Sequence, residues 1–139
     1  MPPRGLPGAP PMNSTISDPL DGSAVRSKDL KRITGNAHVN QTQGQVDYDV
    51  VVALAAIGED GSCGWWNDDS EAFVQRDCYS PFWDKVQLLD LDRWKWKVPS
   101  SLPPGSYRVI SRITTRYGNE PIASDSTTDF RLVQRLRPH

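Results

Sequence analysis

Apolar and polar positions alternate along much of this chain, and the clearest example follows a turn at residues 102–106, Leu-Pro-Pro-Gly-Ser. Proline and glycine favour turns there, because proline cannot donate to a strand ladder and glycine tolerates unusual backbone angles. Beyond the turn, every second residue is expected on one face of a strand: Tyr107, Val109, Ser111 and Ile113. The pattern therefore predicts a strand with one buried face in this part of the chain.

The strongest strand is predicted at residues 46–54. Its first half alternates between polar and apolar residues, and its second half, Val50–Leu54, is wholly apolar. Such a segment is expected to be half exposed at one end and buried on both faces at the other. We therefore expect this strand at the centre of a sheet.

Weaker strand patterns are predicted at residues 15–17, 29–39, 86–91, 93–98 and 127–133. Gly35 interrupts one of them, which suggests a bulge or a close approach of another backbone. In another, Trp94, Trp96 and Val98 share a face opposite Lys95 and Lys97, so both tryptophans are expected in the core. About seven strands separated by turns, with no helical periodicity, predict an all-β antiparallel sandwich.

The segment between Cys63 and Trp83 is too aromatic for an ordinary loop. The spacing of Cys63 and Cys78 suits a disulfide better than a zinc site, and two unpaired buried thiols are the alternative. A disulfide here would stabilise the fold by about 3 kcal/mol and would indicate an oxidising compartment. Adjacent Trp65 and Trp66 are expected to point to opposite faces, one inward and one outward.

Composition narrows the organisation and the classes of partner. The chain has 139 residues and a net charge of −1, which predicts one domain at residues 15–134 and gives no reason to expect nucleic acid as a partner. Residues 1–14 are rich in proline and glycine and are expected to form an arm or linker, while residues 135–139 form a short tail. No apolar run is long enough to predict membrane insertion.

No catalytic motif stands out, so we expect a non-enzymatic protein without a cofactor or a metal. The chain lacks a Gly-x-Ser-x-Gly elbow, a Gly-rich phosphate loop and a His-Glu-x-x-His sequence. The paired carboxylates at Asp68/Asp69/Glu71 and Asp90/Asp92 are expected to be solvated turn acids and not a glycosidase pair. A calcium site is the weaker alternative, and its ligands would be Asp60, Asp68, Asp69, Glu71 and the Asn67 carbonyl.

Several short motifs occur in a recognisable order: Pro19-Leu-Asp-Gly22, Leu30-Lys-Arg-Ile-Thr-Gly35, Cys63-Gly-Trp65-Trp66, Trp94-Lys-Trp96, Leu102-Pro-Pro-Gly-Ser-Tyr107 and Tyr117-Gly-Asn119. This order resembles bacterial immunoglobulin-like domains of secreted and cell-surface proteins. A buried tyrosine that enters a strand and bonds back to nearby backbone is typical of such sandwiches. The resemblance implies an immunoglobulin-like β-sandwich with a disulfide-linked aromatic insertion, at an extracellular or cell-surface location.

Two functions are compatible with these observations. The first is adhesion or structural assembly with other protein subunits or a cell-surface partner, through sheet edges and the N-terminal arm, including a homo-oligomer or filament. The second is a carbohydrate-binding module that contacts glycans through the aromatic segment, with these candidate contacts: Trp65, Trp66, Tyr79 and Trp83. Burial of these rings would favour the first function, and a coplanar exposed row would favour the second.

Overall fold

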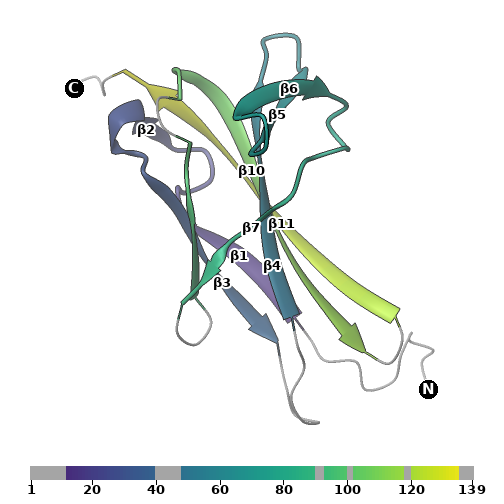
Figure 1. The fold of residues 1–139 in the computed structure, drawn as a ribbon. Coiled ribbons are helices and arrows are strands. Elements are labelled where there is room, and N and C mark those ends of the chain that lie inside the picture. The colour runs from purple at the N-terminus through teal and green to yellow at the C-terminus, as the bar shows by residue number, and fades with distance from the viewer. Residues whose placement is uncertain (1–11, 40–47, 90–92, 100–101, 118–119, 135–139) are drawn as a thin grey trace.

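The structure is a computed structural model that describes residues 12–39, 48–89, 93–99, 102–117 and 120–134. Within these ranges the chain forms strands and one 3-10 turn, Ser27–Asp29, with no α-helix (Figure 1). The strands belong to two sheets. The predicted all-β class is therefore confirmed.

The smaller sheet contains four strands. In spatial order they are β1 (Met12–Asp18), β3 (Arg32–Val39), β9 (Arg93–Lys97) and β8 (Gln87–Leu88). All neighbours in this sheet are antiparallel.

The larger sheet contains seven strands. Six follow one another in space as β2 (Ala24–Arg26), β11 (Glu120–Val133), β10 (Gly105–Tyr117), β4 (Tyr48–Ile57), β5 (Cys63–Asn67) and β6 (Ala72–Arg76), and β7 (Asp84–Lys85) also pairs with β4. β2 pairs with β11 in parallel. The expectation of a wholly antiparallel sandwich is therefore wrong for this pair of strands. Figure 1 shows the long β10 and β11 strands side by side, with β5 and β6 near one end of the molecule.

The described residues form eleven strands, where the alternation pattern predicted about seven. Two of the four additional strands, β2 and β7, have only two or three residues, too few to produce a recognisable alternation. The predicted strand at 86–91 is found only as β8, because residues 84–85 pair with β4 in the other sheet. β5 and β6 form a hairpin inside the aromatic segment, whose turn residues and acids hide the strand pattern.

The main core lies between the two sheets. As predicted, Tyr107, Val109, Ser111 and Ile113 are all buried along one face of β10. From the smaller sheet, Trp94 and Trp96 are buried in the same core, which confirms their expected structural role. The Trp94 indole Nε1 donates a hydrogen bond to the Asn36 carbonyl at 3.2 Å, so this large ring is fixed in both packing and orientation.

Gly35 permits the closest approach within the smaller sheet. A Cβ atom at this position would overlap the Thr15 carbonyl oxygen and the Trp94 ring. The glycine therefore makes room for Trp94 and lets β1 lie against β3. The predicted close approach is confirmed, and the irregularity in register falls in β1, between Ile16 and Asp18.

Strand β1 is tied to the larger sheet by two buried hydroxyls. Ser14 Oγ donates to the Ser111 carbonyl at 3.4 Å, and Ser111 Oγ donates to Ser14 Oγ at 3.2 Å. Buried hydroxyls require such partners, because an unpaired polar group in the interior is costly. Since β1 begins at Met12, residues 12–14 of the predicted arm lie in the sheet; residues 1–11 and the tail at 135–139 lie outside the described residues.

Replacing Gly35 by alanine should destabilise the protein by about 2–3 kcal/mol or more, because the neighbours of the new methyl group are a backbone carbonyl and a fully buried ring. Gly64→Ala is the matched control. Its Cβ would lie 3.5 Å from the Phe73 Cβ, an ordinary contact, so a small change is expected. Urea unfolding of both variants measures the difference, and equal midpoints would contradict the packing described for Gly35.

Tyr107→Phe should reduce the dependence of stability on alkaline pH. The Tyr107 hydroxyl donates to the Pro103 carbonyl at 2.6 Å, and burial raises the pKa of this phenol above the ordinary value of 10.0. Because the folded state retains the proton more tightly than the unfolded state, the stability from this group is complete below pH 10 and falls as pH rises beyond it.

The variant should lose about 1 kcal/mol at neutral pH through the missing hydrogen bond. Between neutral pH and pH values above 10.0, wild type should lose more of its unfolding free energy than the variant. Denaturant unfolding at the two pH values tests this, and parallel losses in both proteins would contradict a buried neutral phenol.

Candidate functional site: the disulfide-linked segment and the adjacent cleft

Strand β4 is buried on both faces at its apolar end, as predicted. Val52 and Leu54 pack in the main core between the sheets. Ala53 and Ala55 face the opposite side and are equally buried, in a second cluster with Cys63 and Trp65. The segment that follows β4 therefore folds back over the outer face of the larger sheet.

Trp65 is the largest side chain of this second cluster. Its ring is fully buried, with 0% exposure, and its Nε1 donates to the Asp77 carbonyl at 3.0 Å. Trp65 is paired in register with Ala55, whose small side chain leaves room for the indole. An enclosed and hydrogen-bonded ring serves packing, and its face is not accessible for stacking on a sugar.

The Cys63–Cys78 disulfide is present and closes this segment on itself, which confirms the predicted pairing. Cys63 is buried beside Trp65, while Cys78, Phe82 and Trp83 pack at the edge of the same cluster. The bond joins the start of β5 to the chain beyond β6, so the hairpin is tied at its base. A disulfide of this kind indicates an oxidising, non-cytoplasmic environment.

Trp66 points to the other side of β5, as alternation requires. It is partly buried against the main core and meets the Phe73 ring edge-on, with centroids 5.3 Å apart. Phe73 in turn contacts Tyr107 at 6.1 Å between centroids. This row of rings connects the hairpin to the core of the sandwich.

The remaining candidate contacts differ widely in exposure. Tyr79 is 92% exposed, whereas Trp83 is partly buried and is covered by the Arg112 guanidinium, 4.4 Å from its ring centroid. Arg112 also forms an ion pair with Asp125 at 2.6 Å, and that hydrogen bond raises the pKa of Arg112. The four aromatic side chains are thus spread over different environments and do not form one exposed row.

Two of the residues named for the calcium alternative accept turn hydrogen bonds with their side chains. Asn67 Oδ1 accepts the Asp69 backbone N–H at 2.9 Å, and Asp60 Oδ1 accepts the Ser62 backbone N–H at 3.0 Å. The hydrogen bonds from Ser62 lower the pKa of Asp60. Among the described residues, no three His, Cys, Asp or Glu side chains gather as metal ligands would. Asp90 and Asp92 lie outside the described residues.

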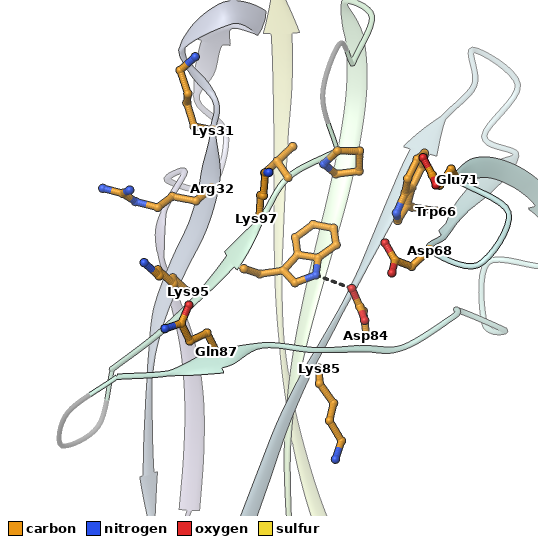
Figure 2. Close-up of a pocket in the computed structure, with 13 residues that line it drawn as sticks. Lys31, Arg32, Trp66, Asp68, Glu71, Asp84, Lys85, Gln87, Lys95 and Lys97 are labelled. Atoms are coloured by element: carbon orange, nitrogen blue, oxygen red, sulfur yellow. Dashed lines mark hydrogen bonds between the residues drawn. The ribbon is translucent and has the colours of Figure 1, made fainter.

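A cleft of about 920 Å³ opens beside the hairpin, between β9 and the turn that joins β5 to β6 (Figure 2). Trp96 lies in its wall and donates from Nε1 to Asp84 Oδ2 at 2.7 Å. Figure 2 shows Asp68 and Glu71 from the hairpin on one side, and cationic side chains from β3 and β9 on the other, among them Lys95 and Lys97. The cleft therefore has one acidic and one basic side.

Sequence reasoning did not find this cleft. Its sides come from segments around residues 31, 66, 84 and 97, which only the fold brings together. Trp96 was predicted as a core residue, and it is one, but its indole N–H reaches the carboxylate of Asp84 at the cleft. An alternating Trp-Lys-Trp-Lys strand carries no signal of this second contact.

The smaller sheet has an open edge at this cleft. β8 pairs with β9 at Trp94 and Lys95 only, and the Leu89 N–H bonds to the Arg93 carbonyl beyond them. On the other side of β9, the Val98 N–H donates to the Lys31 carbonyl and so faces β3. Successive residues of an antiparallel strand direct their N–H and C=O groups to opposite sides. The N–H and C=O of Lys97 therefore point away from β3. In the part of the chain that the structure describes, no strand pairs with Lys97 on that side.

The cleft combines an aromatic wall with charged side chains of both signs. Asp84, one of its acids, accepts the Trp96 hydrogen bond. An aromatic wall, opposed charges and a free strand edge are features that receive an extended chain.

Comparison with known proteins does not assign a family, since no family model matches the chain and no curated protein is similar to it in sequence. The described residues also contain no helix long and apolar enough to cross a membrane.

Breaking the disulfide should destabilise the protein by about 3 kcal/mol, because the unfolded chain gains the freedom of an open loop. The Cys63→Ala/Cys78→Ala variant should therefore unfold at a lower urea concentration than wild type. Intact mass of the native protein, alkylated with and without reduction, tests whether both thiols are bonded. Two freely alkylated thiols in the unreduced native protein would contradict the structure.

Proposed function

We propose that this chain is a non-enzymatic, extracellular immunoglobulin-like module that serves adhesion or structural assembly. The observation that carries the proposal is the open edge of β9 at Lys97, which borders a cleft large enough for an extended peptide. Unpaired strand edges readily accept a strand from another chain, because the added backbone completes the ladder. The partner is then a further subunit of the same protein or a protein on a cell surface.

The strand order supports the immunoglobulin-like part of the proposal. Variable-type immunoglobulin domains place strands A, B, E and D in one sheet and add C′ and C″ to the G, F and C strands of the other. The order β1-β3-β9-β8 and the order β11-β10-β4-β5-β6 follow the same scheme.

The hydrogen bond from Tyr107 to the Pro103 carbonyl provides further support, because it matches the tyrosine corner of such domains. The chain departs from antibody domains two residues later. Val109 stands where the second cysteine would be, and the single disulfide lies in the insertion instead.

The environment of the aromatic rings favours assembly over the alternative, a carbohydrate-binding module. Trp65 is enclosed, Trp66 contacts Phe73, and Trp83 lies under Arg112. Tyr79 alone of the four is largely exposed, and a single tyrosine provides one stacking surface rather than a platform. A glycan screen on the wild-type protein examines this alternative.

Lys97→Pro should weaken self-association, because proline removes the one N–H that faces the open edge and leaves the β3–β9 bonds of Trp96 and Val98 in place. Lys97→Ala is the matched control, since it removes the same charge and keeps the N–H. Losing a backbone hydrogen bond across an interface should raise the dissociation constant of the proline variant by about two- to tenfold over the control.

Light scattering coupled to size-exclusion chromatography over a range of micromolar concentrations measures this difference. Deleting residues 1–11 should also reduce association and leave the thermal unfolding midpoint unchanged, because their proline- and glycine-rich composition predicts an arm and not part of the core. Strictly monomeric wild-type protein, or equal dissociation constants for the two Lys97 variants, would contradict edge-mediated assembly.

A further inference from the structure

A second, smaller pocket of about 460 Å³ lies where the 3-10 turn Ser27–Asp29 leads into β3 and the chain leaves β9. Its apolar lining comes from Leu30, Val98 and Leu102, which are wholly or partly buried. Its volume is within the range of small-molecule sites in proteins. Such a pocket suits the hydrophobic part of a compact ligand.

Three lysines surround this apolar lining: Lys28, Lys31 and Lys97. All three are exposed, and no ion pair joins any of them to another described residue. The nearby acid in the sequence, Asp29, is already bonded to the Arg26 guanidinium at 2.7 Å. No ion pair therefore neutralises these lysines within the described fold, and the acids Asp68 and Glu71 lie on the far side of the neighbouring cleft, which Lys31 and Lys97 also line.

Arg32 adds to this charge, because it lies directly across from Lys97 in the β3–β9 ladder. Like charges in facing positions of a sheet destabilise it. Arg32 does not line the pocket, but an anion held beside Lys97 would relieve that repulsion, and the lysines at the apolar lining indicate where the anion lies.

Ser27 provides an independent observation. It lines the same pocket, and its Oγ is buried without a hydrogen-bond partner. Because the Oγ is closed to solvent, the hydroxyl reaches a ligand oxygen only after rotation about χ1, and that bond would recover the free energy that an unpartnered buried hydroxyl costs. The pocket thus combines an apolar lining, a cationic rim and an unsatisfied hydroxyl.

From these features we propose that this pocket binds a small organic anion, with its carboxylate or other anionic group held by Lys28, Lys31 and Lys97 and by the Ser27 hydroxyl. The apolar body of the ligand packs against Leu30, Val98 and Leu102. This binding does not require self-association, and the pocket shares only Lys97 with the open edge of β9.

Three probes separate the contributions: cyclohexanecarboxylate carries both the charge and the apolar body, cyclohexylmethanol carries the body alone, and inorganic sulfate carries the charge alone. In NMR titrations of the full chain, cyclohexanecarboxylate should bind at least about fivefold more tightly than either of the other two, which corresponds to one exposed charge contact of about 1 kcal/mol. Its chemical-shift changes should centre on residues 27–31, 97–99 and 102.

Variants then test the named side chains. Lys28→Ala/Lys31→Ala should weaken cyclohexanecarboxylate binding by about 25-fold, from two such contacts of about fivefold each. Lys85→Ala is the control, because Lys85 is an exposed lysine on β7 that does not line this pocket. Ser27→Ala should weaken binding without lowering the urea midpoint of the free protein, because its hydroxyl has no partner to lose.

Equal binding of the carboxylate and the alcohol would overturn the proposal, as would shift changes centred elsewhere or unchanged affinity in the double lysine variant. Binding of sulfate as tight as that of the carboxylate would remove the role of the apolar lining and would also overturn it. A lowered urea midpoint for Ser27→Ala in the absence of ligand would contradict the unsatisfied hydroxyl on which the site depends.

Discussion

The burial of β4 on both faces is the constraint on which the rest of the structure depends. Its inner residues, Val52 and Leu54, hold the two sheets together, while Ala53 and Ala55 need a second cover on the outer face. That cover is the disulfide-linked segment, with Trp65 against the two alanines and the Cys63–Cys78 bond at its base. Without it, a strip of apolar surface in the middle of the larger sheet would face solvent.

This constraint explains why aromatic residues gather in one segment. A tryptophan buries a large area, and two alanines leave space for it, so one ring covers what several smaller side chains would otherwise have to cover. The indole N–H of Trp65 and that of Trp96 each find an acceptor, the Asp77 carbonyl and the Asp84 carboxylate. The rings therefore belong to the scaffold, and the surfaces left for partners are the strand edges, the charged cleft and the cationic pocket. On this basis we propose a binding role in assembly and not a catalytic one.

Much of the fold could be predicted from alternation and turn chemistry. Local sequence was enough to predict four features, because each depends on residue types at fixed spacing. They are the Tyr107 face of β10, the two-sided burial of β4, the close approach at Gly35 and the disulfide. The short strands β2 and β7 were not predictable, since two or three residues show no alternation and their pairing with β11 and β4 depends on the whole fold.

The candidate site was less accessible from the sequence. Trp65 and Trp66 were expected to differ in direction, and they do, but the cover that encloses Trp65 is built by residues well beyond it, such as Asp77 and Cys78. The cleft and the cationic pocket each bring together segments that are far apart in the sequence, since both combine residues near Lys31 with residues 97–99. No local pattern therefore marks either of them. Side-chain surroundings, unlike strand direction, depend on the whole topology.

If the aromatic segment is a structural cover and not a ligand platform, the ring of Trp65 must stay enclosed in solution. Hydrogen exchange of the tryptophan indole N–H groups, followed by NMR, measures this. We expect the Trp65 indole proton to exchange as slowly as that of Trp94, because both rings are fully buried and hydrogen-bonded to backbone carbonyls. Rapid exchange at Trp65 with slow exchange at Trp94 would contradict it, since the segment would then open independently of the core.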